Sequence, residues 1–118
     1  MEKSVLIVDD HPSFRASARR MLEADGYEVV GEAEGGRAAL TAAERLRPDL
    51  VLLDVRLPDI DGFEVARRLL DANVRTPQIV LISSQDSIDL GEAIGASGAR
   101  GFIPKSELSA GAITSLLR

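Results

Sequence analysis

The stretch VLIVDDHP, residues 5–12, joins four aliphatic residues directly to a pair of aspartates. An uninterrupted apolar run of this kind is typical of a strand that is buried on both faces of a parallel sheet. Comparable runs occur at LVLLD and QIVLIS, and weaker ones at YEVVGEA and RGFIP. We therefore predict five strands, at residues 5–9, 27–33, 50–54, 78–83 and 100–104.

Helical patterns lie between these runs. Pro12 is suited to open the first helix, because proline lacks only a donor that the first turn leaves unpaired, and Asp25-Gly26 closes it. Gly91 and Gly95 weaken the fourth helix. The remaining patterns complete a set of helices at 12–24, 38–46, 63–70, 88–94 and 108–117. Strand and helix alternate five times, which predicts an α/β fold: a doubly wound three-layer sandwich around a five-stranded parallel sheet.

Length and composition limit the number of domains, the kind of metal site and the partners that this protein can have. The 118 residues suit one compact domain, so 1–118 is predicted as a single unit. There is no cysteine and one histidine, so a metal would be held by oxygen ligands. A net charge of −5 argues against direct binding of nucleic acid. No signal peptide or membrane-span pattern is present, so we expect a cytoplasmic protein that does not contact the membrane.

Three carboxylates follow apolar runs. Asp9 and Asp10 come at the end of the first predicted strand, and Asp54 at the end of the third. If those strands are neighbours, the three acids meet in one crevice and repel one another. A hard divalent cation would relieve this repulsion, and Mg²⁺ fits best, with Mn²⁺ possible. Alternatively Asp10 caps a helix and Asp54 closes a turn, but capping does not explain three acids together.

Ser83 and Lys105 are predicted at the same edge of the sheet, after the fourth and fifth strands. A carboxylate such as Asp54 can act as a nucleophile and form an acyl phosphate. Lysine and a metal ion would offset the charge of the transferred group, and serine would donate a hydrogen bond to it. Taken singly, Ser83 is an ordinary strand-end serine and Lys105 an ordinary surface lysine. Their convergence with the acids indicates phosphoryl chemistry.

Four motifs occur in a characteristic order: IVDDHP, LLDVRLPDIDG, VLISS and GFIPK. With them, residues 5–117 resemble the receiver domain of bacterial two-component response regulators. The amino-acid sequence of these motifs is most similar to that of receivers that carry a C-terminal helix-turn-helix output domain. The resemblance implies a flavodoxin-like strand order, 2-1-3-4-5. It also implies either a stand-alone regulator or the N-terminal receiver of a longer one.

The resemblance implies residue roles as well. Asp54 would be phosphorylated by a sensor histidine kinase or a phosphotransfer protein. Asp10 and Asp54 would ligate Mg²⁺ directly, Asp9 would do so through water, and the backbone carbonyl of Arg56 would complete the protein ligands. The remaining roles are a switch hydroxyl, a switch aromatic and a phosphoryl-pairing ammonium, which fall on Ser83, Phe102 and Lys105.

Several neighbouring residues receive interpretations of their own. Phe102 has a plain alternative as a core aromatic, and His11 is interpreted as a loop residue. Pro58 and Gly62 would shape the loop after Asp54, where glycine can adopt positive φ. Candidate kinase contacts on the first helix are Phe14, Arg15 and Ala18, although Phe14 and Ala18 also fit its core-facing stripe. Arg56 and Gln85 flank the site.

The leading hypothesis is a signalling switch that catalyses only its own phosphorylation and dephosphorylation. The surface formed by the fourth helix, the fifth strand and the fifth helix would serve output or a phosphorylation-dependent homodimer. One alternative is a receiver-like scaffold that binds partners without phosphorylation. A remote alternative is an aspartate-nucleophile phosphohydrolase. Such an enzyme places a second acid two residues after the nucleophile, where this chain has Arg56 after Asp54 and His11 after Asp9.

Overall fold

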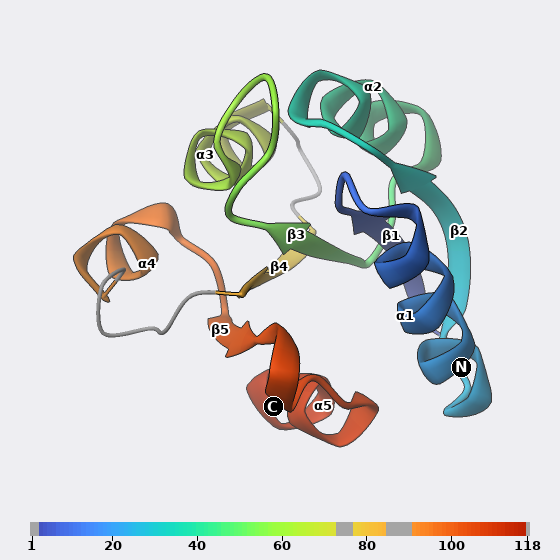
Figure 1. The fold of residues 1–118 in the computed structure, drawn as a ribbon. Helices are drawn as coiled ribbons and strands as arrows, with labels where there is room; N and C mark the ends of the chain where they lie inside the picture. The colour runs from blue at the N-terminus through green and yellow to red at the C-terminus, as the bar shows by residue number, and fades with distance from the viewer. Residues whose placement is uncertain (1–2, 73–76, 85–90, 118) are drawn as a thin grey trace.

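The computed structural model describes residues 3–72, 77–84 and 91–117. Its strands are β1 (Ser4–Val8), β2 (Glu28–Ala33), β3 (Leu50–Asp54), β4 (Gln78–Ser83) and β5 (Gly101–Pro104). All neighbouring strands are parallel, and they lie in the order β2-β1-β3-β4-β5 (Figure 1). This arrangement confirms the predicted doubly wound sheet and its strand order.

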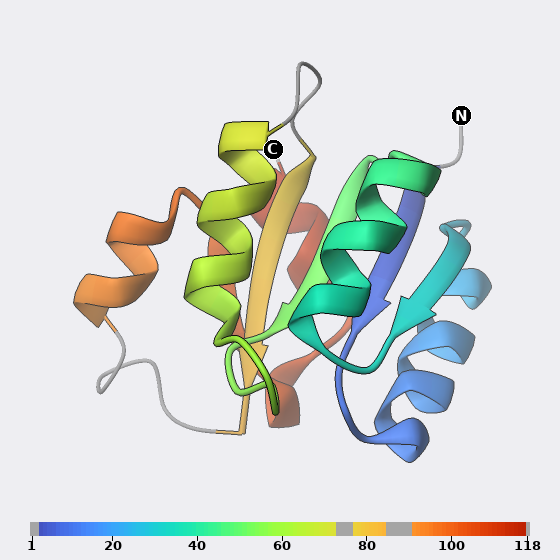
Figure 2. The ribbon, with the colours of Figure 1, turned by 90° about the horizontal axis from the view of Figure 1, so that it is seen from above.

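Helices cover both faces of the sheet (Figure 2). They are α1 (Pro12–Ala24), α2 (Gly36–Leu46), α3 (Gly62–Ala72), α4 (Gly91–Ser97) and α5 (Ala110–Leu117), with a 3₁₀ turn, η2 (Lys105–Glu107), between β5 and α5. One core lies between the sheet and helices α2 and α3, with α4 at its margin, and the other lies between the sheet and helices α1 and α5. The molecule is thus a three-layer sandwich.

The continuous apolar runs are explained by these two cores. In β1, Leu6 and Val8 belong to the core beneath α2 and α3, whereas Val5 and Ile7 belong to the core beneath α1 and α5. All four side chains are fully buried. Successive strand residues point to opposite faces, so a strand covered on both faces needs apolar residues at every position.

Two helices begin elsewhere than predicted because side chains cap them. Helix α2 begins at Gly36 rather than residue 38, since Asp59, distant in sequence, accepts hydrogen bonds from its first amides. Helix α5 begins at Ala110 rather than residue 108. There Ser109 Oγ accepts the N–H of Ala112 at 3.0 Å, and η2 occupies the preceding residues.

Further differences concern β1 and α4, while β2, β5 and α3 differ from the prediction by one or two residues at an end. Strand β1 ends at Val8, so Asp9 follows the strand instead of ending it, although its N–H still donates to Ala33 O of β2. The predicted fourth helix, 88–94, begins outside the described residues. Its described part continues past Ile94 to Ser97, whose hydroxyl donates to the Ile94 carbonyl.

Gly62, at the start of α3, is required for space and not for a positive φ, so that prediction is wrong. Within the described ranges, the glycines with positive φ are Gly26 and Gly98. A Cβ on Gly62 would lie 2.3 Å from the carbonyl oxygen of Asp54, far inside van der Waals contact. The Gly62 N–H also donates to Val55 O at 2.7 Å. The start of α3 is therefore pressed against the backbone that carries Asp54.

Gly62→Ala is accordingly expected to destabilise the fold by about 2 kcal/mol or more, because backbone cannot yield as a flexible side chain can. Gly95→Ala is the matched control, since a Cβ there meets no atom within 4 Å. It lies inside α4, so alanine should stabilise by about 0.5–1 kcal/mol. Urea unfolding of the two variants measures both effects. Equal unfolding free energies would contradict this account of Gly62.

Candidate functional site

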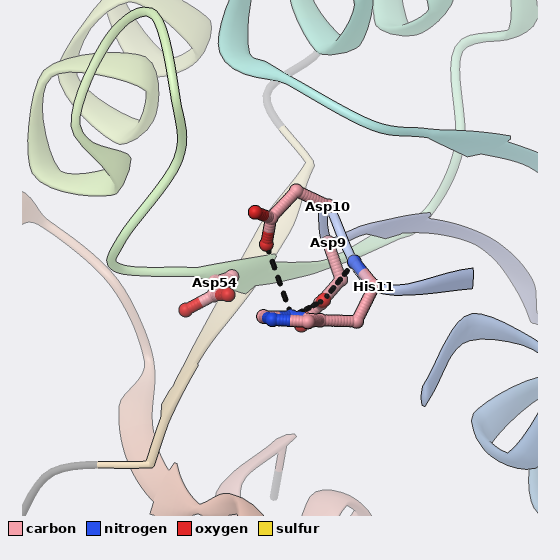
Figure 3. A group of neighbouring side chains, drawn as sticks. All are labelled: Asp9, Asp10, His11 and Asp54. Carbon is pink, nitrogen blue, oxygen red and sulfur yellow. Dashed lines mark hydrogen bonds and ion pairs between the residues drawn. The ribbon is translucent and has the colours of Figure 1, made fainter. Parts of the chain in front are cut away.

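Three acids converge at the carboxyl end of the sheet, as predicted. Asp9 and Asp10 follow β1, and Asp54 ends the neighbouring strand β3 (Figure 3). With His11 they form a group in which one ligand atom of each residue lies within 4.8 Å of the others. Asp9 and Asp54 are almost completely buried, with 0% and 3% of their surfaces exposed.

Lys105 reaches this group from the end of β5. Its Nζ lies 2.6 Å from Asp9 Oδ2 and 3.3 Å from Asp54 Oδ2. Its side chain is 17% exposed, so the ion pairs are largely shielded from water. One ammonium therefore faces two buried carboxylates, which leaves the group with an excess of negative charge.

The pKa values of the two buried acids shift in opposite directions. Burial alone raises the pKa of Asp9, but hydrogen bonds from Lys105 and His11 outweigh it and hold the pKa below its ordinary value. Burial raises the pKa of Asp54 to about 6, against the Arg56 N–H and the charge of Lys105. Burial opposes ionisation of Lys105, yet its bond to Asp9 and the charge of Asp54 raise its pKa. Asp9 is thus the ionised partner, and Asp54 holds its proton more tightly.

His11 is a member of this group that sequence reasoning missed. It is a loop residue, at the N-cap of α1, but its Nδ1 lies 2.9 Å from Asp9 Oδ1 and 3.0 Å from Asp10 Oδ1. Its N–H also donates to Asp9 Oδ1 at 2.8 Å (Figure 3). The signal was its position directly after the two aspartates, where a two-residue span lets a carboxylate accept the amide.

The first turns of α1 contact the backbone that carries Asp9. Arg15 Nη1 donates to the backbone carbonyl of Asp9 at 2.6 Å, and its Nε pairs with Glu32 of β2 at 3.0 Å. Ala18 is 3% exposed and belongs to the core. Of the candidate kinase contacts, Ala18 takes the core-facing role that was its alternative, and Arg15 already makes contacts within the domain.

The remaining predicted residues lie around the group. Ser83 ends β4, is buried, and pairs in register with Pro104, which precedes Lys105. Phe102 lies on β5, partly buried against the α2–α3 core. The Arg56 N–H donates to Asp54 Oδ1 at 3.1 Å. Gln85 falls outside the described residues. The functional roles of these residues stay predictions.

Asp59 anchors the loop that follows Asp54. Its carboxylate accepts the Gly36 N–H at 2.7 Å and the Arg37 N–H at 3.0 Å, at the start of α2. It also accepts the Ile60 N–H at 2.9 Å. The amides of Arg37 and Gly36 lower the pKa of Asp59 to about 2, because they bind the ionised form. One carboxylate therefore links the loop after Asp54 to the start of helix α2.

A pH dependence follows from this lowered pKa. The Asp59 carboxylate stabilises the fold fully above its ordinary pKa of 3.8, and the contribution is lost as pH falls through about 2. Asp59→Asn, which lacks the charge and one acceptor, should unfold at a lower temperature than wild type at pH 6. The gap should shrink steeply as pH falls from 4 to 2, whereas the exposed Asp71→Asn should show no gap. Thermal unfolding across this pH range measures the gap, and one of undiminished size at pH 2 would contradict the assignment.

The donor set fits a hard divalent cation. Asp9, Asp10 and Asp54 offer carboxylate oxygens, which Mg²⁺ and Mn²⁺ prefer. Among the described residues, Asp9 Oδ2 is a buried oxygen with no hydrogen bond of good geometry. Its partner is the Lys105 ammonium at 2.6 Å, an ion pair without that geometry. The three carboxylates carry more negative charge than the one lysine ammonium offsets, and a divalent cation would compensate the remainder.

Comparison with known proteins gives the family. The response regulator receiver domain matches residues 5–117, and the chain belongs to this family. It is 38% identical over 107 residues to the transcription regulator BvgA of Bordetella pertussis, covering 91% of this chain and 51% of that protein. It is 39% identical over 110 residues to a protein-glutamate methylesterase of Hahella chejuensis, covering 93% of this chain and 28% of that protein.

A solved structure agrees with the fold. The signal receiver domain of the response regulator NarL from Mycobacterium tuberculosis superimposes with a TM-score of 0.84 at 32% identity, covering 98% of this chain and 97% of that one. The chain spans about half the length of BvgA and less of the methylesterase. The matched part is thus the receiver domain. The two relatives, a transcription regulator and a methylesterase, differ in the name of the whole protein. Within the described part of the chain, no helix is long and apolar enough to cross a membrane.

Proposed function

We propose that this domain is a phosphoacceptor switch, in which Asp54 takes a phosphoryl group from the phosphohistidine of a sensor histidine kinase or phosphotransfer protein. The observation that carries the proposal is the meeting of Asp54, two further acids and Lys105 at one edge of the sheet. Burial raises the pKa of Asp54 to about 6, and pKa values shifted by burial and a charged partner cluster at functional sites. The family match supports the same chemistry.

The transfer needs one nucleophile and charge compensation. An oxygen of Asp54 attacks phosphorus and forms the new P–O bond, while the P–N bond to the donor imidazole breaks and the imidazole keeps the electron pair. Lys105, already 3.3 Å from Asp54 Oδ2, offsets the charge of the transferred group. The Arg56 N–H on Asp54 Oδ1 orients the carboxylate, so that Oδ2 faces the lysine.

Mg²⁺, with Mn²⁺ as a substitute, would be held by Asp10, Asp54 and the carbonyl of Arg56, with Asp9 acting through water. When bound, it supplies positive charge that offsets the negative oxygens of the phosphoryl group. The residues of this chain keep the acids close enough for one ion, since Lys105 and His11 hold Asp9 in place.

The output side of the switch is assigned to Ser83 and Phe102. Ser83, buried at the end of β4, would donate its hydroxyl to the phosphoryl group. Phe102, only partly buried on β5, would change rotamer and so alter the surface made by α4, β5 and α5. That surface would serve output or a phosphorylation-dependent homodimer. In this proposal the domain works in the cytoplasm, alone or as the receiver of a longer regulator.

Acetyl phosphate and beryllofluoride test the proposal together. With Mg²⁺, acetyl phosphate should add one phosphoryl group by intact mass, and a chelator should prevent it. Beryllofluoride, a stable phosphoryl mimic, should bind with Mg²⁺ and shift the amide signals of β4, β5 and α4. Binding without a detectable adduct would mean fast hydrolysis. Neither adduct nor binding would favour a scaffold, and turnover of many equivalents of a phosphomonoester would favour a phosphohydrolase.

A further inference from the structure

An aromatic ring lies against the lysine of the site. The Lys105 Nζ is 4.5 Å from the centroid of the Phe14 ring, on the first turn of α1. At this distance an ammonium over a ring face is attracted by the negative charge of the π system. The contact joins the phosphoacceptor site to a helix that contributes neither carboxylate nor hydroxyl to it.

Lys105 depends on such contacts for its position. It stands at the first residue of a short 3₁₀ turn, and lysine carries its charge on a flexible four-carbon stem. The carboxylates of Asp9 and Asp54 hold the ammonium at 2.6 and 3.3 Å. The ring supplies a further contact, and it is itself anchored, because Phe14 packs against the core between the sheet and helices α1 and α5.

We infer that Phe14 is a positioning residue that holds the Lys105 ammonium against Asp9 and Asp54. Its consequence for phosphoryl binding rests on the proposed function, whereas the contact itself does not. A ring that attracts the ammonium lowers the population of rotamers in which Lys105 turns toward water. Leucine keeps the apolar packing of Phe14 but has no π face, and tyrosine keeps the face.

The test compares Phe14→Leu with Phe14→Tyr. Met21→Ala, in the same core and on the same helix, controls for a loss of packing alone. The chain has two lysines, Lys3 and Lys105, so lysine-labelled protein gives two assignable sets of side-chain NMR signals. In wild type the methylene next to Lys105 Nζ should carry the upfield shift of a proton above an aromatic ring. The second readout is the affinity for beryllofluoride in the presence of Mg²⁺.

The inference predicts a joint pattern. Phe14→Leu should lose the upfield shift and weaken beryllofluoride binding by about 2- to 5-fold, the size of a partly exposed cation–π contact. Phe14→Tyr and Met21→Ala should keep both. An unchanged Lys105 signal in Phe14→Leu would overturn the inference, as would a lost signal with unchanged affinity. Wild-type protein that binds no beryllofluoride would contradict the proposed function, while the Lys105 signal would still decide the contact.

Discussion

Asp54→Asn is expected to make the metal-free domain more stable at pH 7 while abolishing phosphoryl uptake. Asp54 is 3% exposed and lies beside Asp9, and burial raises its pKa to about 6. Above that pH the wild-type fold holds an ionised carboxylate in an unfavourable place. Asparagine keeps an oxygen for the Arg56 N–H and removes the charge. The raised pKa already includes the attraction of Lys105, and we expect a net gain of about 1–2 kcal/mol.

The raised pKa of Asp54 predicts how the stability difference between Asp54→Asn and wild type changes with pH. A raised acid pKa means that the folded state retains a proton which the unfolded chain has lost, so stability falls as pH rises from 3.8 towards 6. The advantage of Asp54→Asn should therefore be absent at pH 3.5 and complete above pH 6. Urea unfolding in chelator at several pH values measures it, with the exposed Asp71→Asn as control. An asparagine variant less stable than wild type at pH 7 would contradict the account.

The predicted loss of phosphoryl uptake is tested with Asp54→Asn and the control Asp71→Asn. Incubation with acetyl phosphate and Mg²⁺ should leave the intact mass of Asp54→Asn unchanged, because an amide is not a nucleophile of this kind. Asp71→Asn should gain one group, as wild type does. An adduct of equal yield on Asp54→Asn would place the acceptor elsewhere.

Lys105→Met is expected to have the opposite effect on stability. It removes the ammonium that faces Asp9 and Asp54 and leaves both buried acids without that cation. Breaking a buried pair by removing one partner costs about 3–5 kcal/mol. Protonation of Asp54 relieves part of this, so we expect a loss of about 2–4 kcal/mol at pH 7 in chelator. Lowering the pH to 5 should recover part of the loss.

The loss of Lys105 should also slow the chemistry. Removing a charged group that stabilises a transition state costs about 10²- to 10³-fold in rate, so phosphorylation by acetyl phosphate should slow by about 10²-fold. Lys3→Met is the matched control. Lys3 is the other lysine and donates to Gln78, at the start of β4 and far from the site. Equal stabilities and rates for the two methionine variants would mean that Lys105 is only a surface residue.

The fold was predictable largely because its strands are buried on both faces. Residues 5–8, 50–53 and 79–82 are apolar at every position, a pattern that a surface strand does not show. Helix starts were less predictable. Helix α2 begins early because Asp59, 23 residues away, caps Gly36, and no local signal at residues 36–38 encodes that partner.

The acids and the lysine of the site were predictable, whereas the membership of His11 and the contacts between the side chains were not. Asp9, Asp10, Asp54 and Lys105 stand at strand ends, and parallel strands bring their carboxyl ends to one edge. The position of His11 between two carboxylates depends on side-chain rotamers, which sequence spacing does not determine. The contact between the Phe14 ring and Lys105 is equally hidden in the sequence, because these two residues lie 91 positions apart in the chain.

The most direct test of the account is to identify the phosphorylated residue. The domain would be phosphorylated with acetyl phosphate and Mg²⁺, reduced with borohydride, which traps an acyl phosphate, and mapped by peptide mass spectrometry. A reduced side chain is expected at position 54 alone, and none is expected when Mg²⁺ is chelated. A reduced side chain at Asp9 or Asp10 would contradict the assignment of Asp54 as the acceptor, and so would a Mg²⁺-independent adduct.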